Sequence, residues 1–250
     1  MKTISFSYYL LFCVFGLTAG IHAQSNSVSV HHFEKVIISP HIEVTLVEGD
    51  EESVRIDDAK LSEDKIKIKV EGKTLRIYLD GAKTFTKSER VTHGEWNGRR
   101  SRYHGTLVSA TITYKTLKML SVRGEEVVSC KSAINQAGFK LRIYGESKVY
   151  LDSVSVDEFI VSLYGESYLK ISEGSINRQV YRAYGESEVN AMAIGNASTK
   201  ITAYGESNFR VNVSDRLKVS CYGEASIDYR GEAAVNKGIV IGEASIRKIG

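Results

Sequence analysis

Proline and cysteine are scarce in this chain, and long hydrophobic runs are almost absent. Its 250 residues include one proline and three cysteines. Only Cys130 and Cys221 lie beyond the N-terminal segment, which is too few for the disulfide framework of a small secreted scaffold. After residue 23 no stretch approaches the ~20 consecutive apolar residues of a transmembrane helix. The composition therefore excludes a disulfide scaffold and predicts no membrane-spanning segment in the mature chain.

The chain also lacks a strong net charge and a recognisable catalytic motif. It has 33 basic and 30 acidic residues, for a formal net charge of +3 at pH 7. Nucleic-acid binding would require a clustered basic surface, so we expect no nucleic-acid partner. The six histidines are scattered, and no Gly-x-Ser-x-Gly, His-Glu-x-x-His or phosphate-loop motif occurs. We therefore expect a non-enzymatic protein, without catalytic or metal-binding residues.

Residues 1–23 have the features of a secretory signal peptide. Lys2 supplies a positive start, an apolar run follows from Tyr8 to Leu17, and Ile21-His22-Ala23 ends in a small residue suited to cleavage. The apolar run is too short to span a bilayer. We predict export, to the periplasm, the outer-membrane surface or the extracellular space.

The dominant feature of the sequence is a repeat built around Tyr-Gly-Glu-Ser. The motif occurs at Tyr144–Ser147, Tyr164–Ser167, Tyr184–Ser187 and Tyr204–Ser207, and degenerates at Tyr222–Ala225 and Ile241–Ala244. From Gly124 onward, the glycines of the series are 21, 20, 20, 20, 18 and 19 residues apart. On both sides of each glycine, apolar residues alternate with polar ones at a period of two, which is the pattern of β-strands. Each repeat is therefore two short strands joined at a glycine corner.

Such repeats predict an all-β, single-domain parallel β-helix over residues 28–250, with coils of about twenty residues. One coil cannot bury its own inward face, whereas stacked copies bury a continuous apolar column. A β-sandwich is the alternative, but it would not produce near-identical motifs at constant spacing. Cys130 and Cys221 fall five coils apart, and at ~4.8 Å per coil they are too distant for a disulfide. We expect both to be buried thiols.

The N-terminal part is less regular and predicts irregular first coils or a strand cap. Such a cap would shield the open edge of the stack. Its predicted strands are Val36–Ile38, Ile42–Val47, Ser53–Ile56, Ile66–Val70 and Thr74–Leu79.

A polar segment, residues 83–105, separates this part from strands that resume at Leu107–Thr113. It holds six basic residues against two acidic ones, and the only tryptophan, Trp96. No strand or helix period is visible in it, so the sequence predicts a long loop. Long loops inside compact domains are usually functional or disordered.

Several stretches of the chain resemble a known family. They are Phe33–Val36, Lys73–Ile77, Lys115–Gly124, Ile227–Gly231 and Ile241–Ala244. From about His32 to Gly250 the chain is similar to the family named "putative auto-transporter adhesin, head GIN domain", found in exported proteins of Bacteroidetes-type bacteria. The resemblance implies a right-handed parallel β-helix and an adhesin-like role, and it supplies no active site. That family's corner motif usually reads Ser-Gly-Ser-Gly, whereas this chain has tyrosine before the glycine and glutamate after it.

One candidate binding surface is a column of glutamates, one per corner. Its members are Glu146, Glu166, Glu186, Glu206 and Glu224, with Glu243 at the last corner. Stacking would place like charges ~4.8 Å apart, which is destabilising unless something offsets the repulsion. We expect solvent and nearby bases to do so, namely Arg142, Lys170, Arg182 and Arg210. Calcium bound by successive carboxylates is the alternative, and no other cofactor is expected.

A second candidate is the parallel column of tyrosines. Its members are Tyr144, Tyr164, Tyr184, Tyr204 and Tyr222. Each is one residue from an inward position, so it should point outward. The column could simply stabilise the sheet through cross-strand aromatic pairs. It could also form an exposed strip that binds a glycan or a cell-surface protein.

The basic segment is a third candidate surface, with Trp96, Arg99, Arg100 and Arg102 available to hold an anionic polymer or a partner protein. The sequence thus favours an exported interaction module, either adhesin-like or a cell-envelope scaffold. The alternative function is a polysaccharide-active lyase or hydrolase on the same scaffold.

Overall fold

The computed structural model describes residues 27–93 and 96–250 of the protein. The predicted signal peptide, residues 1–23, lies outside the described residues. Within them the chain is nearly all strand, and its single helical element is a one-turn 3₁₀ helix, η1 (Glu63–Lys65).

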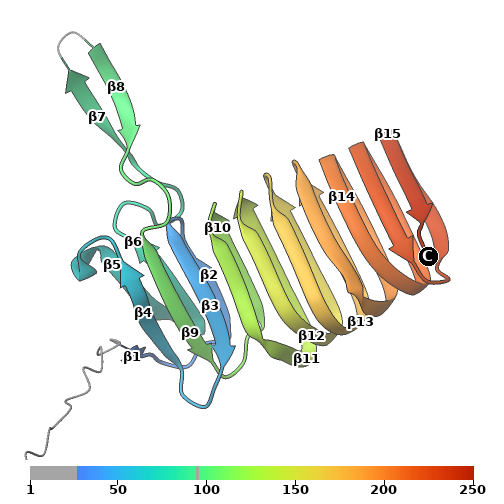
Figure 1. Ribbon diagram of the computed structural model, residues 1–250, viewed down its shortest axis with the longest axis horizontal. Helices are drawn as coiled ribbons and strands as arrows, with labels where there is room; N and C mark the ends of the chain where they lie inside the picture. Colours follow the sequence, from blue (N-terminus) through green and yellow to red (C-terminus); the bar gives the residue numbers. More distant parts are fainter. Residues whose placement is uncertain (1–26, 94–95) are drawn as a thin grey trace, which may run out of the picture.

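The C-terminal half of the chain forms a stack of parallel strands that wind around one axis (Figure 1). The strands are β11 (Val127–Gly145), β12 (Lys148–Tyr164), β13 (Tyr168–Tyr184), β14 (Ser187–Arg230) and β15 (Ala234–Lys248). Each pairs in parallel with the next, and residues one repeat apart lie side by side, as in Tyr144↔Tyr164 and Tyr164↔Tyr184. The stack is a solenoid of about six turns. This confirms the predicted parallel β-helix.

The interior of the solenoid is a continuous apolar column. Leu141, Val161, Tyr181 and Ile201 occupy equivalent positions in successive coils, and each is fully buried. Burying one such side chain contributes roughly 1.5–3 kcal/mol. Cys130 and Cys221 are buried free thiols, as the spacing argument predicted.

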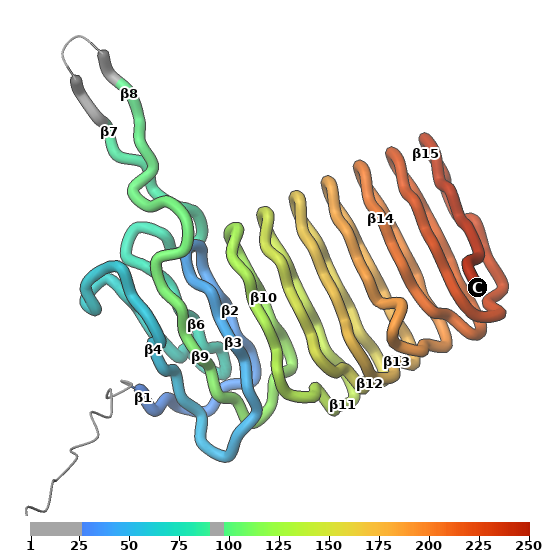
Figure 2. Tube along the Cα trace, viewed as in Figure 1, coloured from blue at the N-terminus to red at the C-terminus, as the bar shows by residue number. Residues whose placement is uncertain are grey.

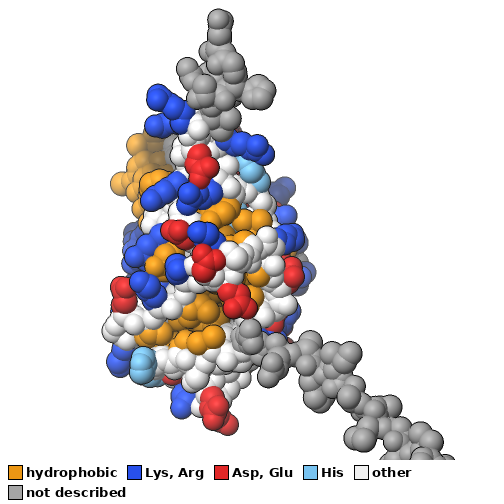
Figure 3. Space-filling view, turned by 90° about the vertical axis from the view of Figure 1, so that its left-hand side faces the viewer, with side chains coloured by type: hydrophobic (Ala, Val, Ile, Leu, Met, Phe, Trp, Pro, Cys, Tyr) orange, Lys and Arg blue, Asp and Glu red, His pale blue; other side chains and the backbone are white. Residues whose placement is uncertain are grey.

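The N-terminal end of the solenoid is closed by antiparallel strands. The elements there are β1 (Ser27–Ser29), β2 (Lys35–Ile38), β3 (Ile42–Glu48), β4 (Ser53–Ala59), β5 (Ile66–Glu71) and β6 (Thr74–Leu79), together with β9 (Val108–Tyr114) and β10 (Met119–Gly124). On one wall β4 pairs antiparallel with β9, and β1 with β4. On the other wall β5 pairs antiparallel with β6. Charged side chains of both signs are spread over this end (Figure 3). Five of these strands pair in parallel and form irregular first coils, namely β2, β3, β6, β9 and β10, and β1, β4 and β5 cap them. The N-terminal part therefore contains both of the predicted arrangements.

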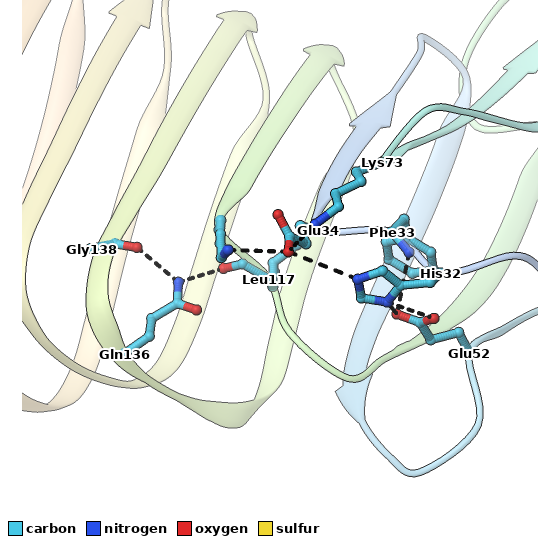
Figure 4. A network of polar contacts seen from close by, with 9 residues as sticks. His32, Phe33, Glu34, Glu52, Lys73, Leu117, Gln136 and Gly138 are labelled. Atoms are coloured by element: carbon cyan, nitrogen blue, oxygen red, sulfur yellow. Dashed lines mark hydrogen bonds and ion pairs between the residues drawn. The ribbon is translucent and has the colours of Figure 1, made fainter.

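Polar side chains join the cap to the first coils (Figure 4). The carboxylate of Glu34, just before β2, accepts a hydrogen bond from Lys73 at 2.9 Å and lies 3.1 Å from the ammonium of Lys118. The hydrogen bonds from these two ammonium groups lower the pKa of Glu34 to about 2. Nearby, the Nδ1 atom of His32 lies 3.1 Å from the nearly buried carboxylate of Glu52.

The segment 83–105 is not the loop that the sequence predicted. It contains a two-stranded antiparallel hairpin, β7 (Ser88–His93) and β8 (Trp96–Ser101). We call the whole segment the arm. It projects away from the solenoid (Figures 1 and 2), so neither face of the hairpin packs on the core. A hairpin without a buried face needs no apolar alternation, which is why its strands left no period in the sequence.

Candidate functional site

The Tyr-Gly-Glu-Ser motifs form one edge of the solenoid, and two of their four residues serve the backbone. The corner glycines have positive φ, for example +102° at Gly165, where an added Cβ would lie 2.7 Å from the carbonyl oxygen of Gly145. The motif serine donates to the glycine carbonyl one coil earlier, as from Ser167 to Gly145 at 3.2 Å and from Ser187 to Gly165 at 3.2 Å. Glycine and serine are therefore structural.

The motif tyrosines form a tyrosine ladder along this edge, made of Tyr144, Tyr164, Tyr184, Tyr204 and Tyr222. Successive ring centroids are 4.7 to 4.9 Å apart, and the ring planes are within 7° of parallel. The three central side chains are 37–38 % exposed. The prediction of an outward, stacked tyrosine column is confirmed.

The ladder exposes ring edges and hydroxyl groups, because neighbouring rings cover each other's faces. The guanidinium of Arg123 lies 4.7 Å from the centroid of Tyr144 and covers the first face. At the other end Ile241 takes the place of a sixth tyrosine beside Tyr222. The ring faces of the exposed aromatic strip that the sequence suggested are therefore mostly covered by the neighbouring rings.

The motif glutamates form a second row beside the ladder, the glutamate row: Glu146, Glu166, Glu186, Glu206, Glu224 and Glu243. All six side chains are exposed. Among the described residues, none of the six has an ion-pair partner. Their exposure agrees with the expected solvated row, and among the described residues no ion pair joins them to the four bases expected near the corners, Arg142, Lys170, Arg182 and Arg210. Lys170, for example, is four residues beyond Glu166, which is ~13 Å along a strand.

Two grooves run along the glutamate row. The larger has a volume of about 470 Å³. Carboxylates from Glu166, Glu186, Glu188 and Glu206 line it together with one base, Lys148, and the rings of Tyr150 and Tyr168. The smaller, about 230 Å³, continues along Glu206, Glu224 and Glu243. The edge thus combines a predominantly acidic groove, with four carboxylates and one lysine, with a row of phenol hydroxyls.

The base of the arm adjoins the first rung of the ladder. Ser39 donates to the carbonyl oxygen of Lys83 at 2.7 Å, and His41 is hydrogen-bonded to Thr86 at 2.6 Å. A cavity of about 270 Å³ is lined from one side by the exposed Phe85 and from the other by Tyr144. The base of the arm therefore lies beside the first tyrosine of the ladder.

The arginines of the arm do not reach the ladder. Arg90 and Arg99 face each other across the hairpin and are exposed, as is Arg100 opposite Glu89. Arg102 donates to Glu89 at 2.7 Å, and this contact raises its pKa. The backbone of Trp96 begins β8, and its side chain lies outside what the structure describes.

Sequence reasoning missed one groove of about 580 Å³ on a different corner. It is lined by serine and asparagine side chains, among them Ser155, Ser175, Asn177 and Asn196. Its only sequence signal is the recurrence of small polar residues one repeat apart. Within residues 27–93 and 96–250, no group of three His, Cys, Asp or Glu side chains is arranged to hold a metal ion. No helix in the same residues is long and apolar enough to cross a membrane.

Comparison with known proteins places this architecture in a family. The model of the family described as "putative auto-transporter adhesin, head GIN domain" matches residues 32–233. The chain belongs to this family. No curated protein matches the sequence.

Solved structures share the head GIN fold at low sequence identity. A "putative adhesin" from Bacteroides fragilis NCTC 9343 is 18% identical with a TM-score of 0.72, and the match covers 89% of this chain and 95% of that one. A "putative lipid binding protein" from Parabacteroides distasonis ATCC 8503 is 17% identical with a TM-score of 0.64, covering 90% and 95%. A "putative adhesin" from Parabacteroides merdae ATCC 43184 is 15% identical with a TM-score of 0.62, covering 90% and 95%. These likenesses show the fold and leave the ligand to the chemistry of the site.

Proposed function

We propose that this head GIN protein is an exported, non-catalytic, adhesin-like module that holds a basic segment of a cell-surface protein along its tyrosine–glutamate edge. The observation that carries the proposal is the glutamate row. One exposed carboxylate recurs at each of six successive corners, and among the described residues none of the six has an ion-pair partner. A row of like charges at the spacing of sheet strands is unfavourable by itself. A bound cationic segment would remove that repulsion.

Two further features support a protein partner over a glycan. Sugar binding on an aromatic residue uses a free ring face, whereas the ladder rings stack at 4.7 to 4.9 Å and leave only edges and hydroxyls outward. The groove beside the glutamate row contains two tyrosine rings, Tyr150 and Tyr168, next to four carboxylates. Aromatic faces and carboxylates together favour lysine and arginine side chains. Export follows from the predicted signal peptide, residues 1–23.

The proposal is tested by measuring affinity for probes of defined charge. The probes are lysine- and arginine-containing peptides, their glutamate-substituted counterparts, and neutral and acidic polysaccharides. We expect the basic peptides to bind, with an affinity that falls as salt is raised, because exposed charges are screened. Glu166→Gln with Glu186→Gln should weaken binding about tenfold or more, since each charged contact contributes roughly 1 kcal/mol or more.

The matched control is Glu158→Gln with Glu173→Gln, which removes two acidic groups away from this edge. It should leave peptide affinity unchanged. An equal loss of peptide affinity in both double variants would show that only the net charge of the protein matters, and it would contradict the proposal. Turnover of a polysaccharide would instead support the alternative, a lyase or hydrolase on this scaffold.

The arm is a second candidate surface, because Arg90, Arg99 and Arg100 are exposed on a projecting hairpin. It would hold an anionic polymer or an acidic protein patch. Arg99→Gln with Arg100→Gln separates the two surfaces, since it should abolish binding of acidic probes and leave basic peptides bound.

A further inference from the structure

One wall of the solenoid carries basic side chains and no acidic ones. The wall consists of β6, β2, β10 and the segments that lead up to the next five corner glycines, residues 140–144, 160–164, 180–184, 200–204 and 218–222. Neighbouring segments pair in parallel from β6 to residues 200–204. These eight segments contain no aspartate or glutamate and eight bases, namely Lys35, Arg76, Arg123, Lys140, Arg142, Arg182, Lys200 and Lys218. We call this face the basic wall.

Most bases of the basic wall point outward and are unpaired. Lys140 and Arg142 flank the buried Leu141, so they project away from the core. Arg123 lies over the ring of Tyr144. Among the described residues, none of the other seven bases has an ion-pair partner. Positive charges without counter-ions in the protein are available to an anionic ligand.

Acidic groups lie along both long borders of this positive charge. One border is the glutamate row, which follows the tyrosine ladder. On the other border four carboxylates precede the strands, at Glu34, Asp157, Glu158 and Asp215. Ion pairs with Lys73, Lys118 and Arg178 engage Glu34 and Glu158. The unpaired bases therefore form a strip, eight strands or ~34 Å long, in which they occupy the positions five and three residues before the glycine.

The spacing of the bases suits an extended chain with an anionic group on every second unit. Arg142, Ser162, Arg182 and Thr202 are neighbours in successive coils. The two arginines are therefore two strand spacings apart, ~9.6 Å, with the hydroxyl group of Ser162 between them. An extended sugar chain advances by about one strand spacing per sugar, and it offers hydroxyl groups between its charges. A guanidinium group binds a carboxylate through two parallel hydrogen bonds.

A cavity near the start of the strip supplies a second observation. Its volume is about 440 Å³, and its charged lining consists of four bases and one acid, namely Lys35, Lys118, Lys140, Arg142 and Glu158. Apolar side chains line the rest, from Met119, Phe139 and Ile160. A uronic acid has the same mixed character, because its ring has an apolar C–H face and a charged carboxylate at the edge.

We propose that the basic wall binds a linear acidic polysaccharide, which lies along the stack with carboxylates on Arg142 and Arg182. Three observations favour this partner over nucleic acid or a membrane. The acidic borders would repel a broad polyanion such as duplex nucleic acid. Single-stranded nucleic acid stacks its bases on aromatic faces, which the ladder rings cover. Binding in a membrane interface buries apolar side chains, and the only exposed large hydrophobic residues that the eight described segments carry are ladder tyrosines.

Titration calorimetry with hyaluronan oligosaccharides tests the proposal, because this linear chain carries one carboxylate on every second sugar. The carboxyl-reduced oligosaccharide is the neutral comparison. We expect the acidic chain alone to bind, with an affinity that falls as salt is raised. Arg142→Gln with Arg182→Gln should weaken binding about tenfold or more, since each change removes a charge-assisted contact. Both side chains are exposed, so the fold should tolerate the change.

The matched control is Lys170→Gln with Arg210→Gln, which removes two exposed bases beyond the glutamate row and should bind hyaluronan like wild type. The wall variant should keep its affinity for basic peptides. Glu166→Gln with Glu186→Gln should keep hyaluronan bound. Failure of the basic wall and failure of the tyrosine–glutamate edge are therefore distinguishable.

The arm is the rival location for an acidic chain, and the two surfaces make opposite predictions. Loss of hyaluronan binding in Arg99→Gln with Arg100→Gln, but not in the wall variant, would assign the chain to the arm and overturn the proposal. Equal loss in the wall variant and its matched control would overturn it as well, because only net charge would then matter. So would an absence of binding, or tighter binding of a DNA oligonucleotide or anionic phospholipid vesicles that the wall variant loses.

Discussion

At the residue scale, each Tyr-Gly-Glu-Ser motif combines two residues that the backbone requires with two that it does not. Glycine permits the positive φ and the close approach between corners, and serine satisfies a glycine carbonyl of the preceding coil. The rings stabilise one another, at about 0.5–1.5 kcal/mol per aromatic pair. The glutamates have no such contact in the described structure, so folding alone does not account for them. This separation is why substitution can test fold and binding independently.

The corner glycine should be the least replaceable residue of the motif. We expect Gly165→Val to lower the free energy of unfolding by more than about 2 kcal/mol, because valine would be strained at a φ of +102° and its Cβ would meet the Gly145 carbonyl oxygen at 2.7 Å. Chemical denaturation followed by circular dichroism measures the loss. Gly195→Ala is the control, since an added Cβ there meets nothing within 4 Å. Equal stability of wild type and Gly165→Val would contradict the assigned role of the corner.

At the element scale, sequence reasoning succeeded where strands bury one face and failed where they do not. The alternating apolar residues of β2, β3 and β6 were visible because their inward side chains are buried. The hairpin of the arm was invisible, since β7 and β8 project from the body and have no core to match. Ion pairs such as those of Glu34 could not be predicted either. Lys73 lies 39 residues after Glu34 in the sequence and Lys118 lies 84 residues after it, and only the fold brings the three side chains together.

The hairpin of the arm, residues 88–101, should be dispensable for folding. Arg102 donates its backbone N–H to the carbonyl oxygen of Lys87 at 3.0 Å, so these two residues already face each other as strand neighbours. Replacing residues 88–101 by Asn-Gly, a dipeptide suited to a two-residue hairpin turn, should close the chain at that point. We expect the melting temperature to change by less than about 4 °C, because less than about 1 kcal/mol of stability should be lost. A large fall in melting temperature would show that the hairpin packs on the solenoid.

The ion pairs of Glu34 should make the cap sensitive to acid. The pKa of Glu34 is lowered from 4.5 to about 2 in the folded state, first by the hydrogen bond from Lys73 and next by that from Lys118. Its stabilising contribution is therefore complete above pH 4.5 and is lost as the pH falls toward 2. We expect the stability difference between wild type and Glu34→Gln to shrink over that interval. Glu173→Gln, at an exposed position of β13, is the control and should show no such convergence.

At the scale of the whole molecule, the repeat revealed the stack but not how the stack ends. A coil in the middle and a coil at the end carry the same pattern, because Val235 and Val240 repeat the residue types of Leu217 and Cys221. Their exposure depends on whether something lies beyond them. The sequence also could not show that the arm lies beside the tyrosine ladder. Phe85 and Tyr144 are far apart in the sequence, and they line one cavity only because of the way the chain folds around the first corner.

The position of a coil in the stack should also set the order in which the solenoid loosens. Each coil contacts only its neighbours, so local stability is the sum of nearest-neighbour terms, and a coil with one neighbour opens most easily. We expect native-state hydrogen exchange at low protein concentration to be fastest for the amides of β15 and slowest for those of β12 and β13, which have a coil on either side. The cap should protect the N-terminal coils to an intermediate degree. Uniform protection along the stack would contradict the nearest-neighbour account.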